Sequence, residues 1–271
     1  MNRIEIDLRG KRRVVTPNAI TAFGLCCGLF IIFKSVLKTS SSLELMHRLQ
    51  GLSLLLISAM IADFSDGAVA RIMKAESAFG AHFDSLSDAI TFGIAPPLIA
   101  IKSLNGEYGG TFCSSFLLLT CIIYSLCGVL RLVRYNLFAA TGEKATTFTG
   151  LPIPAAAACV VSLGVLLASD TLNSLPERAR VLLVSLGLLL SGCLMISTWR
   201  FPGLKHFHFR VSSSLLVLGI GLVACLFFSG LVDHFTQVFF LVSWLYVLVV
   251  APVFSFINKR FINKGKNRSN N

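Results

Sequence analysis

The sequence contains few charged residues for its length. Aspartate, glutamate, lysine and arginine make up 14% of its 271 residues, against about 25% in a typical soluble domain. Hydrophobic residues reach 55%, and the mean hydropathy is +0.77. This composition argues against a water-soluble globular protein.

Cysteine and histidine motifs are also lacking. None of the eight cysteines forms C-x-x-C, and the five histidines do not form H-E-x-x-H. Most of the cysteines lie in apolar stretches, where cysteine serves as a small apolar side chain. We therefore expect neither a disulfide framework nor a metal site built from cysteine or histidine.

Long apolar stretches dominate the sequence instead. Each has about 20 residues, which is enough to cross the hydrocarbon layer of a bilayer as a helix. Short polar segments separate them, and the connections leave no room for a separate soluble domain. The sequence thus predicts an all-α polytopic membrane protein with about eight transmembrane helices, at residues 17–37, 51–73, 82–103, 112–138, 151–169, 179–198, 211–231 and 236–257.

The distribution of basic residues predicts an orientation. If the N-terminus lies in the cytoplasm, 18 of the 24 lysines and arginines fall on the cytoplasmic side, and the positive-inside rule then gives an N-in, C-in topology. Residues 1–16 form a basic N-terminal segment and residues 258–271 a basic tail, both facing the anionic cytoplasmic leaflet. The net charge of +11 is therefore explained by the membrane surface, and we expect no nucleic-acid partner.

Four acidic residues break the apolar pattern. Nine of the 13 acids lie in tails or connections, but Asp63 and Asp66 lie inside the second stretch, and Asp84 and Asp88 open the third. A charged side chain at membrane depth costs at least about 2.5 kcal/mol on insertion scales. These four carboxylates therefore need a compensating positive charge.

Helical periodicity places the four acids on two facing surfaces. Asp63 and Asp66 share one helical face, Asp84 and Asp88 share another, and the two helices are expected to be antiparallel. A set of oxygen ligands without histidine or cysteine suits Mg²⁺ or Mn²⁺, and four carboxylates are enough for two ions. Small residues beside the acids would leave space for a flat ring or a phosphate, or would serve close helix packing; they are Gly67, Ala70 and Gly80, with Arg71 at the border.

The whole pattern is D-x2-D-G-x2-A-R-x8-G-x3-D-x3-D over residues 63–88. It resembles the signature of the CDP-alcohol phosphatidyltransferase family. Four further segments resemble the phosphatidylserine synthase branch of that family: TPNAIT (16–21), SDAITFGIAPP (87–97), LRLVRYN (130–136) and GLPIPAAA (150–157). The resemblance implies a catalytic membrane core at residues 17–160, followed by additional transmembrane helices at 161–257.

The resemblance also implies an activity. The family transfers the phosphatidyl group of CDP-diacylglycerol to an alcohol, here the hydroxyl of L-serine, giving phosphatidylserine and CMP by metal-assisted direct displacement. Asp63, Asp66 and Asp84 would bind two Mg²⁺ or Mn²⁺ ions, and Asp88 would be the general base while also touching a metal. Gly67, Ala70, Arg71 and Gly80 would border the nucleotide. A homodimer in a bacterial inner membrane, with its active site facing the cytoplasm, is implied as well.

The acceptor alcohol follows from a weaker pattern. Arg131 and Arg134 are three residues apart, hence on one helical face near the cytoplasmic end. A guanidinium there could hold the carboxylate of serine with two hydrogen bonds, or it could bind lipid phosphate or extend to the interface. Inositol, glycerol 3-phosphate or choline remain alternative acceptors. An ion or proton transporter and an inactive structural paralogue are alternatives of other classes.

Overall fold

The computed structural model describes residues 3–37, 42–73, 77–106, 108–140, 150–169, 172, 175–197 and 232–250. Regular structure in these ranges is entirely helical, which confirms the predicted all-α architecture for this part of the chain. The stretch predicted at 211–231 and the basic tail at 258–271 lie outside the described residues.

Four of the predicted stretches form long helices. They are long and apolar enough to cross a membrane, with candidate spans at Val15–Val36, Glu44–Met73, Thr111–Leu137 and Glu177–Ile196. The helices that contain them are α1 (Arg3–Val36), α2 (Ser42–Met73), α5 (Thr111–Ala140) and α7 (Glu177–Ile196). Because α1 begins at Arg3, the basic N-terminal segment continues directly into the first span.

The third predicted stretch, 82–103, is not one regular helix. It is divided into α3 (Ala78–Asp88), the π-helical segment η1 (Ala89–Ile94) and α4 (Ala95–Ser103). Pro96 and Pro97 lie in the first turn of α4, and neither has a backbone N–H to donate to the preceding turn. The π-helical segment begins directly after Asp88 and ends just before these prolines. Hydropathy alone does not reveal it, since all three segments are apolar.

The remaining described helices are shorter. They are α6 (Ile153–Leu167), α9 (Val232–Leu245) and the π-helical segment η4 (Tyr246–Val250). In α6 the side chains of Ala156, Val161 and Val165 are fully buried, so this helix lies in the core. Trp244 of α9 donates its indole N–H to the carbonyl of Cys159, which fixes α9 to α6.

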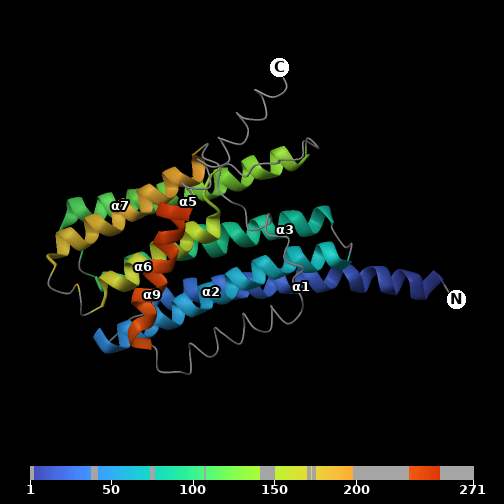
Figure 1. Ribbon diagram of the computed structural model, residues 1–271, viewed down its shortest axis with the longest axis horizontal. Coiled ribbons are helices and arrows are strands. Elements are labelled where there is room, and N and C mark those ends of the chain that lie inside the picture. Colours follow the sequence, from blue (N-terminus) through green and yellow to red (C-terminus); the bar gives the residue numbers. More distant parts are fainter. Residues whose placement is uncertain are drawn as a thin grey trace, which may run out of the picture.

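The helices α1 and α2 lie side by side, with α3 next to them (Figure 1). The approach of α1 to the broken third helix is close, because a Cβ atom on Gly28 would overlap the Thr91 side chain. Thr21 and Gly24 lie on the same helix, about two turns and one turn before Gly28, respectively. The packing of α1 thus brings them to the place where α2 and α3 carry their acids.

Candidate active site

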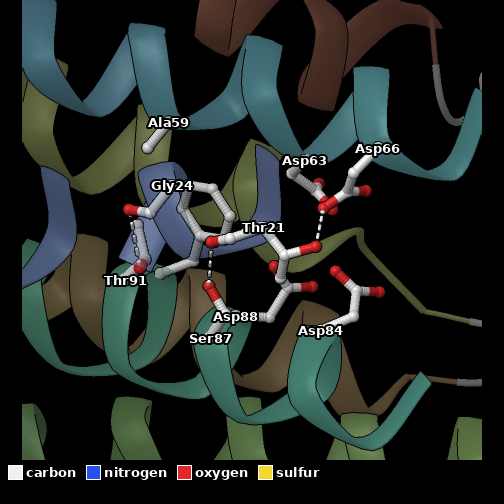
Figure 2. A pocket seen from close by; sticks show the side chains of 10 residues that line it. Thr21, Gly24, Ala59, Asp63, Asp66, Asp84, Ser87, Asp88 and Thr91 are labelled. Atoms are coloured by element: carbon white, nitrogen blue, oxygen red, sulfur yellow. Dashed lines mark hydrogen bonds between the residues drawn. The ribbon is translucent and has the colours of Figure 1, made fainter. Parts of the chain in front are cut away.

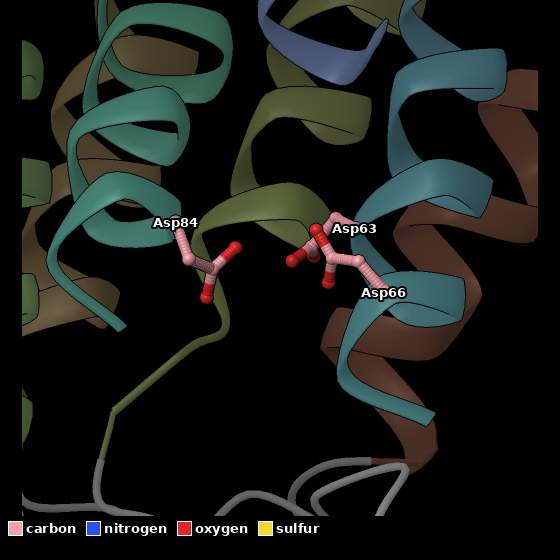
Figure 3. Close-up of side chains that lie close together, drawn as sticks. All are labelled: Asp63, Asp66 and Asp84. Atoms are coloured by element: carbon pink, nitrogen blue, oxygen red, sulfur yellow. The ribbon is translucent and has the colours of Figure 1, made fainter. Parts of the chain in front are cut away.

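Three of the four intramembrane acids converge. Asp63 and Asp66 come from α2 and Asp84 comes from α3, and one carboxylate oxygen from each lies within 4.8 Å of the others. Figure 3 shows the two helices presenting these side chains to each other. Asp66 is only 5% exposed. The spacing of the acids in the sequence had predicted this meeting of two acidic faces.

The chemistry of this triad fits a hard divalent cation. Three carboxylates at such separations repel one another strongly, and burial away from water increases the repulsion. Carboxylate oxygens are the preferred protein ligands of Mg²⁺ and Mn²⁺. The triad of Asp63, Asp66 and Asp84 could therefore hold a metal ion.

Asp88 lies in the same recess but one helical turn further along α3. The recess has an empty volume of about 190 Å³, part of it open to solvent. Figure 2 shows Asp88 near Thr21 and Asp84. All four acids line the recess, together with Thr21, Gly24, Ala59, Ser87, Thr91 and Phe92.

Thr21 is a site residue that the acidic pattern alone did not identify. Its hydroxyl donates a hydrogen bond of 2.6 Å to Oδ2 of Asp66, and the side chain is 6% exposed. The Ser87 hydroxyl donates to the Thr21 carbonyl, and the Thr91 hydroxyl donates to the Gly24 carbonyl, both at 3.5 Å. The segment TPNAIT, which ends at Thr21, was the available signal. Helix α1 is thus tied to both acid-bearing helices.

The four residues expected at the nucleotide fall into two groups. A Cβ atom on Gly80 would lie 3.0 Å from Oγ of Ser77 and 3.1 Å from Oδ1 of Asn18, so this glycine lets α3 approach α1. A Cβ atom on Gly67 would meet only Nη1 of Arg71, at 3.7 Å, so packing does not require glycine there. Gly67, Ala70 and Arg71 belong to the last two turns of α2, just beyond the acids.

The two arginines of α5 have different surroundings. Arg134 donates a hydrogen bond of 3.0 Å to the carbonyl of Ile196, at the C-terminal end of α7. Arg131 lies near enough to Asp88 and Asp63 for their charges to interact. Its Nε atom is buried and has no hydrogen-bond partner among the described residues. Of these two arginines, Arg131 is the one whose charge acts on Asp88 and Asp63.

Comparison with known proteins identifies the family. The sequence profile of the CDP-alcohol phosphatidyltransferases matches residues 14–200. The chain belongs to this family. The match contains α1 to α7 from residue 14 onward, and with them every residue of the recess. The enzymes of this family depend on a metal, in agreement with the carboxylate triad.

Relatives of this CDP-alcohol phosphatidyltransferase occur in distant organisms. A Helicobacter pylori protein is 35% identical over 204 residues, which are 74% of this chain and 78% of the relative. A Bacillus subtilis protein is 32% identical over 70% of this chain and 90% of its own length. A Methanocaldococcus jannaschii protein is 34% identical over 67% and 81%. All three are named CDP-diacylglycerol–serine O-phosphatidyltransferase.

The hydrogen bond from Thr21 predicts an effect on metal binding. Outer partners that orient a ligating carboxylate typically contribute about 10- to 100-fold to metal affinity. Thr21→Val keeps the shape of the side chain but removes the donor, so we expect this phosphatidyltransferase to bind Mn²⁺ about tenfold more weakly. Titration of the purified protein with Mn²⁺, followed by electron paramagnetic resonance, measures this without any turnover.

Thr21→Ser is the matched control, because it retains the hydroxyl and should bind Mn²⁺ nearly as the unmodified protein does. Equal affinities in the valine and serine variants would show that Thr21 does not orient Asp66.

Proposed function

We propose that this protein transfers the phosphatidyl group of CDP-diacylglycerol to the hydroxyl of L-serine, releasing CMP and forming phosphatidylserine. The observation that carries the proposal is the convergence of Asp63, Asp66 and Asp84 in one recess with Asp88, inside the region that matches the family. The names of the bacterial and archaeal relatives support serine as the acceptor.

The carboxylates form the metal end of this site. In the proposal Asp63, Asp66 and Asp84, with Asp88 beside them, hold two Mg²⁺ or Mn²⁺ ions. Such ions supply positive charge that binds the diphosphate and stabilises the departing CMP. Gly67, Ala70, Arg71 and Gly80 border the cytidine diphosphate, and the bare backbone at Gly67 allows close approach.

Asp88 is proposed as the general base. It accepts the proton of the serine hydroxyl while the serine oxygen forms its bond to the phosphorus of the phosphatidyl group. The bond between that phosphorus and the oxygen of the CMP phosphate breaks, and CMP leaves with the bonding electrons. The donor's acyl chains remain in the bilayer throughout, so the reaction takes place at the interface.

Arg131 is proposed to bind the carboxylate of serine. Its charge lies near Asp88, so a carboxylate held by this guanidinium would bring the serine hydroxyl toward the base. Arg134 has a backbone partner at the end of α7, which gives it a structural role. The position of Arg131 thus favours one of the two arginines that the sequence offered.

The proposal includes a location and an assembly. The excess of basic residues in alternate connections favours an N-in, C-in orientation, which places the recess on the cytoplasmic side of a bacterial inner membrane. Nucleotides and free serine are available there. We further propose that the protein acts as a homodimer, as the family resemblance implies.

The acceptor is tested by CMP release from the purified, detergent-solubilised protein. CDP-diacylglycerol and Mg²⁺ or Mn²⁺ are offered with L-serine, myo-inositol, glycerol 3-phosphate or choline in parallel. We expect CMP release with serine only, and none from an Asp88→Asn variant, because the amide cannot accept the proton. Release with another alcohol alone would keep the metal site and overturn the choice of serine.

Gly67 provides a test of the nucleotide position. Alanine fits there without displacing neighbours and favours the helix by up to about 1 kcal/mol. Gly67→Ala should therefore leave the melting temperature unchanged or raised, while its methyl group obstructs the nucleotide and raises the KM for CDP-diacylglycerol about tenfold.

The matched control for Gly67→Ala is Gly51→Ala on the same helix, where a Cβ atom would meet nothing within 4 Å. This variant should keep the donor KM. A normal donor KM in Gly67→Ala would place the nucleotide elsewhere.

Arg131→Lys tests how the acceptor is bound. Lysine keeps the charge but loses the planar fork that holds a carboxylate with two hydrogen bonds. We expect the KM for serine to rise about tenfold, the magnitude of one lost hydrogen bond to a charged group, with little change in the KM for CDP-diacylglycerol. If Arg134→Lys shows this effect and Arg131→Lys does not, Arg134 binds the serine carboxylate instead.

A further inference from the structure

Two prolines in the third span remove the α-helical donors of two backbone carbonyls. In an α-helix the carbonyls of Phe92 and Gly93 would accept from the N–H groups of residues 96 and 97, but both residues are prolines. Helix α5 supplies the missing donors. The Tyr124 hydroxyl donates to the Phe92 carbonyl at 3.0 Å, and the Ser125 hydroxyl donates to the Gly93 carbonyl at 2.8 Å.

The two helices also approach closely at this point. A Cβ atom on Gly128 would lie 3.9 Å from Cα of Gly93 and 2.9 Å from Cδ1 of Ile153. Ile153 at the start of α6 is fully buried and fills the space beside both glycines. Little space is left for α5 to move sideways against η1.

A second pair of hydrogen bonds joins α5 to α3, nearer the acids. The Asn136 amide donates to Oγ of Ser85 at 3.0 Å. The Ser85 hydroxyl is within 3.3 Å of Oδ1 of Asn136 and can donate back to it. Ser85 follows Asp84 directly, so α5 is attached to α3 next to a proposed metal ligand.

Arg131 lies between these two attachments. Tyr124 and Ser125 precede it by about two turns, and Asn136 follows it by more than one turn. The order of the contacts is that of two antiparallel helices, with η1 opposite Tyr124 and Ser125 and with Ser85 opposite Asn136. Asp88 and Arg131 each lie between these two attachments, so they fall at a similar level along the helices. Slippage of α5 by one turn would move Arg131 by about 5.4 Å.

We propose that Tyr124, Ser125 and Asn136 are positioning residues that hold Arg131 at a fixed place beside Asp88, and that they thereby set the affinity for the acceptor alcohol. This inference rests on the proposed function, since it assigns Arg131 to the acceptor. It gives a role to the Phe92 and Gly93 carbonyls of the segment SDAITFGIAPP and to Asn136 of the segment LRLVRYN.

The test compares Tyr124→Phe, Ser125→Ala and Asn136→Ala with Thr120→Val. Thr120 is a matched control, because it lies on the same helix, is fully buried and donates only within its own helix, to the Leu117 carbonyl. The readouts are the KM for serine, the KM for CDP-diacylglycerol and the melting temperature. We expect the three variants to raise the serine KM about three- to tenfold, the range of single hydrogen bonds between membrane helices.

The donor KM should stay constant in all variants, and Thr120→Val should change neither KM. Ser125→Thr, which keeps the hydroxyl, should restore the serine KM. Should Tyr124→Phe not yield folded protein, Ser125→Ala at its half-buried position carries the same test.

Lowered melting temperatures with an unchanged serine KM would overturn the inference, because the hydrogen bonds would then only stabilise the fold. An equal rise in both KM values would overturn it as well. If the unmodified protein uses another alcohol, the proposal of serine as the acceptor is wrong, but the positioning inference can still be tested. The KM for that alcohol then replaces the KM for serine in the comparison.

Discussion

Electrostatic repulsion among the carboxylates is the main constraint on the helices around the recess. Two unit charges about 5 Å apart repel each other by roughly 3 kcal/mol at an effective dielectric constant of 20, and Asp63, Asp66 and Asp84 approach within 4.8 Å. Arg131 contributes one positive charge near Asp63 and Asp88, which cannot balance all of them. Divalent ions bound by the carboxylates could supply the remaining positive charge. Without such ions the mutual repulsion of the carboxylates opposes folding, and metal binding would offset this cost.

Such a cluster works only if its geometry is fixed before the ion arrives. Among the side chains that the structure describes, α1 contributes no carboxylate to the recess, yet it connects both acid-bearing helices through Thr21, Ser87 and Thr91. The close approach at Gly28 allows these short side chains to reach across. The Thr21 hydroxyl therefore orients Asp66 directly, and the other two hydrogen bonds hold α1 against the segment that carries Asp84 and Asp88.

The sequence predicted the acidic cluster more completely than its surroundings. Helical periodicity and two aspartate pairs were enough to bring Asp63, Asp66 and Asp84 together, because the spacing of residues on a helix is fixed. The same reasoning put Arg131 and Arg134 on one helical face, but it could not tell which of them acts near the acids. Arg134 bonds to a carbonyl of α7 that is 62 residues away in the sequence. Thr21 was missed as a site residue for a similar reason. Its contact with Asp66 depends on how α1 packs, which helical periodicity does not predict, and the segment TPNAIT was the only signal for it.

The division of the third span was also open to prediction, and it connects the two halves of the site. Pro96 and Pro97 remove helical hydrogen bonds, and in a bilayer the freed carbonyls need partners within the protein. Tyr124 and Ser125 provide these partners, so the break that weakens one helix attaches it to another. The acid-bearing segment ends at this break, and the helix attached there carries Arg131. A continuous apolar helix would offer its neighbour no free carbonyls. The two prolines thus give α5 a defined register against the acids. A hydropathy profile treats the span as uniform and does not detect this attachment.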